Sequence, residues 1–120
     1  MIKEIKINPV AKPRMTQRDR WKKRDCVNKY YAFKDELRLK THNFTMGKRV
    51  GLYFYIPFPK SYSKKKRNEL YLKPHQEKPD IDNLIKAVLD CLLEDDKKVW
   101  HVTAHKVWAF EGMIQIENLE

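Results

Sequence analysis

Acidic side chains gather in one short stretch of this otherwise basic sequence. Of the sixteen aspartate and glutamate residues, seven lie between positions 77 and 96, at Glu77, Asp80, Asp82, Asp90, Glu94, Asp95 and Asp96. Mg²⁺ takes hard oxygen ligands, usually one or two protein carboxylates completed by water and by phosphate oxygens of a substrate. Such an ion activates water and stabilises the charge that develops when a phosphodiester is cleaved. The stretch therefore indicates a cation site suited to phosphodiester chemistry.

The first acids of this stretch stand at the start of a predicted helix, residues 81–92. Asp80 and Asp82 flank its N-terminus, and Lys86 projects from the same flank as Asp82 because consecutive residues turn by about 100°. A lysine there is placed to neutralise a phosphate or to help a leaving group. Ordinary alternatives exist: either aspartate caps the helix, Asp82 and Lys86 form an i,i+4 ion pair, and Asp90, next in the row, is a solvated helix acid.

Two segments have the apolar periodicity of helices and would position these acids. The clearer one is residues 81–92, whose apolar positions follow the spacing i, i+3, i+4, i+7, i+8 and i+11, at Ile81, Leu84, Ile85, Val88, Leu89 and Leu92. Residues 25–40 form a second amphipathic helix around Tyr30, Phe33 and Leu37. Cys91 falls on the apolar side of its helix and is predicted to be a small core residue.

The remaining pattern predicts strands. Short β segments are expected at residues 2–7, 50–56, 99–110 and 113–116, with a turn near Glu111 and Gly112. Residues 60–78 are interpreted as a long, mobile connection. The order β-α-β-α-β-β predicts one α/β (α+β) domain over residues 1–120, a small mixed β-sheet with two main helices.

The charge balance favours a polyanionic partner. Lysine and arginine number 26 against 16 acidic residues, which gives a formal net charge of +10. Nucleic acid is the commonest partner for such a field, and an anionic membrane surface is the main rival. The longest apolar run, residues 50–58, is too short to span a bilayer, and we expect neither a membrane segment nor a secretory signal. The two cysteines lack metal-site spacing, which favours a reduced, cytoplasmic protein.

Two basic runs are candidate DNA-binding segments. The first contains Lys12, Arg14, Arg18, Arg20, Lys22, Lys23 and Arg24, and the second contains Lys64, Lys65, Lys66 and Arg67. Trp21 and Tyr62 lie among them as candidates to stack on opened bases, and His75 is a candidate phosphate contact. The alternative is a solvated charged face with packed aromatics. His101 and His105 lack a third ligand, so we interpret them as surface or packed residues rather than a metal pair.

The sequence KPDIDNLIKAVLD at residues 78–90, followed by EDDKKV at residues 94–99, closely resembles the signature of RusA-like Holliday-junction resolvases. The segment at residues 12–14 and the lysine-rich connection before Pro79 are similar to phage or prophage members of that family. The resemblance runs over nearly the whole chain. It implies a RusA-like fold and a homodimer that resolves four-way DNA junctions by paired symmetric nicks in recombination and repair.

The resemblance also implies roles for single residues. Asp80, Asp82 and Asp96 would be catalytic metal ligands, Lys86 would be the essential lysine, and Asp95 would be a less favoured ligand. The cofactor would be Mg²⁺, with Mn²⁺ as a substitute, and no small-molecule cofactor is expected. The protein would act on DNA junctions, away from membranes, in the cytoplasm of a bacterial or phage-infected cell.

One departure from the family pattern concerns the third aspartate. Only residues 91–94 separate Asp90 from Asp95, without the glycine-bearing turn expected in many relatives. In an unbroken helix Asp82 and Asp96 would lie about 21 Å apart, too far to share one ion. Either the helix stops early and the chain folds back, or Asp96 reaches the site of the other subunit. A binding-only module, a ribonuclease and another phosphodiesterase remain alternative functions.

Overall fold

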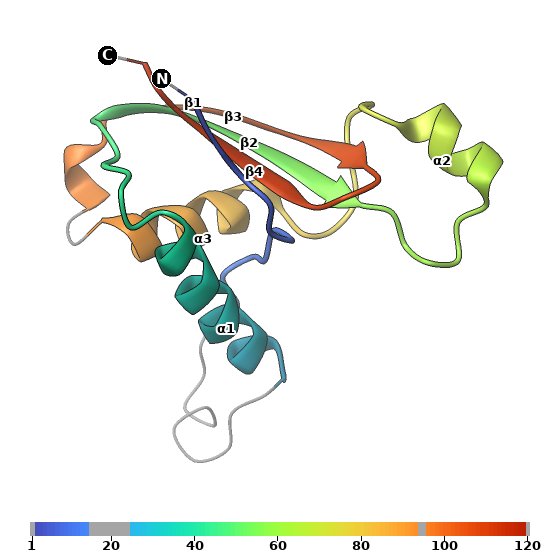
Figure 1. Cartoon of the computed structure of the whole chain (residues 1–120), viewed down its shortest axis with the longest axis horizontal. Helices are drawn as coiled ribbons and strands as arrows, with labels where there is room; N and C mark the ends of the chain where they lie inside the picture. Colours follow the sequence, from blue (N-terminus) through green and yellow to red (C-terminus); the bar gives the residue numbers. More distant parts are fainter. Residues whose placement is uncertain (1, 15–24, 94–95, 120) are drawn as a thin grey trace.

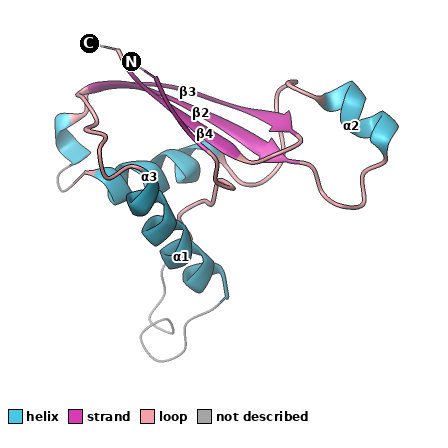
Figure 2. Cartoon of the chain, viewed as in Figure 1, coloured by secondary structure: helices cyan, strands magenta, loops and turns pink. Residues whose placement is uncertain are grey.

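A computed structural model describes residues 2–14, 25–93 and 96–119 of the chain. The chain forms one sheet with helices against it (Figures 1 and 2). In chain order the elements are β1 (Ile2–Ile5), α1 (Asp25–Lys40), β2 (Arg49–Pro57), α2 (Lys64–Leu70), α3 (Ile81–Leu92), the 3₁₀ turn η2 (Asp96–Lys98), β3 (His101–Ala109) and β4 (Met113–Asn118).

The sheet has the strand order β1-β4-β2-β3. The pairs β1/β4 and β4/β2 are antiparallel, whereas β2 and β3 are parallel. A parallel pair needs a crossover connection. Here that connection contains α2, α3 and η2, so the acid-rich stretch begins and ends beside the same edge strand, β3.

The core lies between one face of the sheet and the helices α1 and α3 (Figure 2). Along β2 the buried side chains alternate, at Val50, Leu52, Phe54 and Ile56, as expected for a strand with one covered face. The intervening Tyr53 and Tyr55 point to the other face, where their hydroxyls donate to Glu117 and Gln115. From the helices, Leu37, Leu84 and Val88 complete the apolar layer.

The two helices predicted from periodicity are confirmed with the bounds 25–40 and 81–92, and each predicted strand has a counterpart in the mixed sheet. The expectation of a long mobile connection over residues 60–78 is wrong. This segment contains an additional helix, α2. Because α2 has no buried residues, its sequence shows no apolar periodicity. Ser63 caps this helix by accepting from the backbone N–H of Lys66.

The return from α2 also joins the sheet. The N–H groups of Leu72 and His75 donate to the carbonyls of Trp108 and Lys106, and the N–H of Trp108 donates to the carbonyl of Lys73. Residues 72–75 thereby cover the edge of β3 over its C-terminal half, which would otherwise present unpaired backbone groups.

The packing of α3 sets the position of the acids, and Leu84 is one of its buried contacts. Leu84 is 1% exposed and lies in the core cluster. We expect Leu84→Ala to lower the free energy of unfolding by about 2–5 kcal/mol, because a cavity remains where the side chain was. Urea unfolding followed by circular dichroism measures this. Leu39→Ala, at a residue 76% exposed on α1, is the control and should change little; equal effects for both variants would contradict the packing described.

Candidate active site

The turn that begins α3 presents two exposed aspartates. Asp80 is the N-cap residue, with extended backbone angles, and its carbonyl accepts from the N–H of Leu84. Its side chain, however, makes no capping hydrogen bond. Asp82 follows in the first turn and is also exposed. The capping explanation for Asp80 therefore does not hold, and its carboxylate is available to a ligand from solution.

Lys86 lies one turn further along α3 and is exposed. It forms no ion pair with Asp82 or with any other residue in the part of the chain that the structure describes. The simple i,i+4 ion-pair interpretation is therefore not supported. Two exposed carboxylates thus stand at the start of α3 and one exposed ammonium group follows on the next turn, where the acids could meet a cation and the lysine a phosphate.

The start of α3 is fixed by a lysine on the sheet. Lys106 of β3 donates from its Nζ to the carbonyl oxygens of Glu77 at 2.5 Å and Pro79 at 2.6 Å. Hydrogen bonds from a charged donor are stronger than those between neutral groups. The residue immediately before Asp80 is thus tied to the sheet, and no local sequence pattern predicts this contact because Lys106 is distant in the chain.

The N-terminal segment fastens α3 from another side. The backbone N–H of Lys12 donates to the carbonyl of Asn83 at 3.0 Å. The Lys12 ammonium pairs with Asp90 at 2.5 Å. Asp90 is therefore a partner within the fold rather than a simple solvated acid. The sequence suggested that Lys12 binds DNA, but its ammonium group pairs with Asp90 within the protein. We therefore do not assign Lys12 to the DNA-binding surface.

The backbone of Asp96 follows the C-terminal end of α3, whereas Asp80 and Asp82 stand at its N-terminal end. Helix α3 ends at Leu92 and Leu93 is extended, so the helix stops before it reaches Asp96. The chain then returns towards the start of α3 along β3, and Lys106, which holds that start, lies five residues after His101, or about 16 Å further along the strand. The turn η2, which begins at Asp96, precedes β3 and follows the C-terminal end of α3. Asp95 falls outside the described residues.

The donor set at the start of α3 suits a hard cation. Asp80 and Asp82 offer carboxylate oxygens, and Mg²⁺ usually takes only one or two of these, completing its shell with water and substrate phosphates. Among the described residues no group of three or more histidine, cysteine or acidic side chains is arranged around a common point. His105 instead stacks on Tyr53, with ring centroids 4.6 Å apart.

Comparison with known protein families identifies the family of this chain. The family model described as Endodeoxyribonuclease RusA matches residues 6–117. The chain belongs to the RusA family. Membership implies a Holliday-junction resolvase nuclease, and the matched span includes the whole start of α3. Curated proteins gave no match. Within the described residues, no helix is both long and apolar enough to cross a membrane.

The structure divides the second basic run of this RusA-family chain into two kinds of residue. Lys64, Lys65 and Lys66 are exposed on α2. Arg67 instead donates from its guanidinium to the carbonyls of Tyr62, Pro59 and Lys60, and so holds the loop before α2. Only the lysines are therefore presented to a phosphate backbone. Of the first run, Arg14 is exposed, while Arg18, Arg20, Lys22, Lys23 and Arg24, together with Trp21, lie outside the described residues.

His75 is not presented to solvent, contrary to its suggested contact with phosphate. Its side chain is only 4% exposed, its ring lies 4.2 Å from the ring of Trp108, and its Nδ1 is buried without a hydrogen-bond partner. Burial lowers the pKa of His75 below its ordinary value of 6.5, and the charge of Lys106 lowers this pKa further, while Glu77 acts in the opposite direction. His75 is a buried neutral residue beside the Lys106 anchor.

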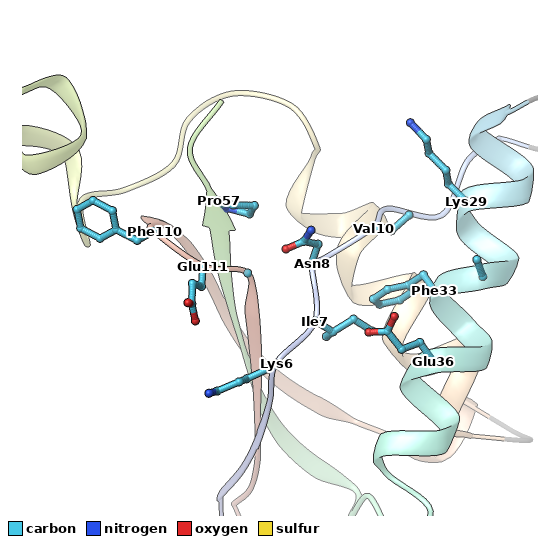
Figure 3. A pocket seen from close by; sticks show the side chains of 12 residues that line it. Lys6, Ile7, Asn8, Val10, Lys29, Phe33, Glu36, Pro57, Phe110 and Glu111 are labelled. Atoms are coloured by element: carbon cyan, nitrogen blue, oxygen red, sulfur yellow. The ribbon is translucent and has the colours of Figure 1, made fainter. Parts of the chain in front are cut away.

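The structure contains a hollow of about 710 Å³ (Figure 3). It is enclosed by the chain after β1, by α1 and by the turn between β3 and β4, with Lys6, Lys29, Glu36 and Glu111 among its lining residues. Neither Asp80 nor Asp82 lines it. The candidate active site therefore lies outside this hollow, on an exposed turn, as expected for a protein whose substrate is a large polyanion.

The buried His75 should make stability depend on pH. Because its folded pKa lies below the unfolded value of 6.5, the unfolded chain gains a proton first, and stability falls as the pH drops below that value. We expect the loss in unfolding free energy between about pH 7.5 and about pH 5.5 to be smaller in His75→Phe than in the parent protein. Urea unfolding at both pH values measures it. An unchanged dependence in His75→Phe would contradict the burial.

Proposed function

We propose that this protein is a Mg²⁺-dependent crossover-junction endodeoxyribonuclease. It would resolve four-way (Holliday) junctions as a homodimer, by paired symmetric nicks, during recombination and repair in the cytoplasm, with Mn²⁺ as an effective substitute ion. One observation carries the proposal beyond family membership. Asp80 and Asp82 stand exposed at the anchored start of α3 and Lys86 stands exposed on the next turn, with no capping bond at Asp80 and no ion pair between Asp82 and Lys86.

Each residue at this turn has a distinct task in the proposed reaction. The carboxylates of Asp80 and Asp82 would hold the ion and so fix where a DNA phosphate binds. Mg²⁺, when bound, supplies an activated water and positive charge at the phosphate. The Lys86 ammonium would neutralise charge on the phosphate oxygens or on the departing oxygen. Lys106 keeps the turn in place through its bonds to Glu77 and Pro79, which limits misplacement of the scissile phosphate.

The third family aspartate favours a site shared between subunits. Asp96 begins η2, beyond the C-terminal end of α3, while Asp80 and Asp82 stand at its N-terminal end. An antiparallel pair of α3 helices about a two-fold axis would bring the Asp96 of each protomer towards the Asp80 and Asp82 of the other. The proposal is therefore a homodimer with two composite sites, which suits two symmetric nicks.

DNA affinity would come mainly from the exposed cations. Lys64, Lys65 and Lys66 are exposed on α2 and would contact phosphates, which supply salt-dependent affinity without reading base sequence. Selectivity for a junction must then come from its shape or from its opened bases. For Arg18, Arg20, Lys22, Lys23 and Arg24, contact with DNA stays a prediction from the sequence.

The first test separates cleavage from binding. Asp82→Asn should reduce junction cleavage at least about 100-fold, because it removes a ligand charge from the ion, while junction affinity stays within about twofold of the parent because phosphate contacts dominate it. Cleavage and gel-shift assays use a synthetic four-way junction, with linear duplex, flap DNA and hairpin RNA as competing substrates. Asp35→Asn, at an exposed acid on α1, is the matched control and should cleave normally.

Other outcomes of this assay identify the alternatives. Junction binding without cleavage by the parent would indicate a binding-only module. Preferential cleavage of hairpin RNA would indicate a ribonuclease. Equal loss of binding and cleavage in Asp82→Asn would show that the residue supports the fold rather than the chemistry.

The second test concerns the shared site. We expect Asp82→Asn and Asp96→Asn homodimers each to be inactive, and a mixture of the two, after subunit exchange, to regain nicking. In a heterodimer with composite sites, one site receives both substitutions and the other receives none, so each junction is nicked once rather than twice. Nicked and resolved products separate on native gels. Absence of any restored nicking, with heterodimers verified by mass spectrometry, would exclude sharing.

A further inference from the structure

Residues 59–74 form an arm that projects from the end of β2 and returns along β3 (Figure 1). The arm carries six basic residues and one acid, Glu69; the basic residues are Lys60, Lys64, Lys65, Lys66, Arg67 and Lys73. Its helix α2 buries no residue. A short helix without a buried face gains little from packing, so its residues are better explained by contact with a partner of opposite charge.

Aromatic side chains close the base of this arm against β3. Trp108 is 6% exposed and packs against Phe58, whose ring centroid lies 5.6 Å away, and against Tyr62 at 5.7 Å. The Tyr62 ring also carries the Lys66 ammonium, 3.8 Å from its centroid. The sequence suggested that Tyr62 stacks on a base. In the structure its ring is already covered by Trp108 of the sheet and Lys66 of the arm.

Two other aromatics at the same place remain open to solvent. Tyr71 is 46% exposed and Phe110 is 50% exposed, and their ring centroids lie 5.1 Å apart. Phe110 is held in position by an edge-on contact with Phe58 at 5.3 Å. Leu72, the next residue in the chain after Tyr71, is 51% exposed. An ordered pair of exposed rings beside a basic arm is the combination used to stack nucleic-acid bases while cations hold the backbone.

The rings and the acids are connected through β3. Phe110 follows Lys106 by four residues, about 13 Å in an extended chain, and Lys106 holds the residue before Asp80. This span equals roughly four base steps of 3.4 Å. A base stacked on Tyr71 and Phe110 would therefore belong to the few nucleotides around the cut.

We propose that Tyr71 and Phe110 form a stacking platform for an unpaired base at the branch point of a DNA junction, with the lysines of α2 holding phosphates of the same strand. The platform gives the enzyme a preference for junctions over duplexes, because bases inside a duplex already stack on one another. The positive charge of the arm favours DNA over a protein partner as the occupant. This inference rests on the proposed function and adds the residues that select the substrate.

The test uses Asp82→Asn as the parent, so that binding is measured without cutting. Four-way junctions carrying 2-aminopurine at successive branch-point positions, and a linear duplex of the same sequence, report affinity and base stacking. We expect Tyr71→Ala to weaken junction binding by about tenfold, the effect of losing one stacked base, and to abolish quenching at one position. Duplex affinity should change by less than about twofold. Tyr71→Phe should restore both junction signals, and Leu39→Ala, an exposed apolar control on α1, should alter neither.

The outcomes distinguish the platform from the function on which it rests. If the parent binds junction and duplex equally, both the proposed function and the platform fail. If the parent prefers the junction and Tyr71→Ala keeps that preference and the quenching, the platform alone is overturned. A parallel fall in junction and duplex affinity, or a change of oligomeric state on sedimentation, would also overturn it, since the rings would then serve general binding or contact between copies.

Discussion

The ammonium group of Lys106, bonded to the carbonyls of Glu77 and Pro79, is the contact on which the candidate site depends. The chain before Asp80 is a connection without regular structure, and α3 alone cannot define the position of its own first turn. By fixing two carbonyls with one charged donor, the sheet sets where the helix begins and where its two aspartates point. The carboxylates thereby acquire the rigidity of the sheet although they stand exposed on a turn.

The same strand also organises the surface proposed for DNA. Two residues after Lys106, Trp108 receives the return of the arm through backbone bonds to Leu72 and Lys73, and its ring supports Phe58 and Tyr62. The anchor of the acids and the base of the basic arm are therefore parts of one extended segment. A substrate held by the arm would be positioned relative to the acids without an intervening hinge, which favours precise placement of a phosphate.

The parts predicted from sequence and the parts missed differ in the range of the interactions that determine them. Helix α3 was predictable because Leu84 and Val88 belong to a local apolar period, and Asp80, Asp82 and Lys86 because they belong to one contiguous motif. Helix α2 was missed because its residues have no buried face; it is stabilised by Ser63 and by the guanidinium of Arg67. Two contacts join residues that are far apart in the chain: Lys12 pairs with Asp90, and Lys106 donates to the carbonyl of Pro79. No local sequence pattern predicts such contacts.

The proposed chemistry requires a divalent ion at the start of α3. Because Asp96 follows the other end of that helix, its proposed contribution to the site also requires a two-fold dimer. The most direct measurement is anomalous diffraction from crystals of the protein with a four-way junction and Mn²⁺. Our account predicts an anomalous peak at the carboxylates of Asp80 and Asp82, beside a DNA phosphate. A well-ordered junction complex with no peak near these two residues would contradict it.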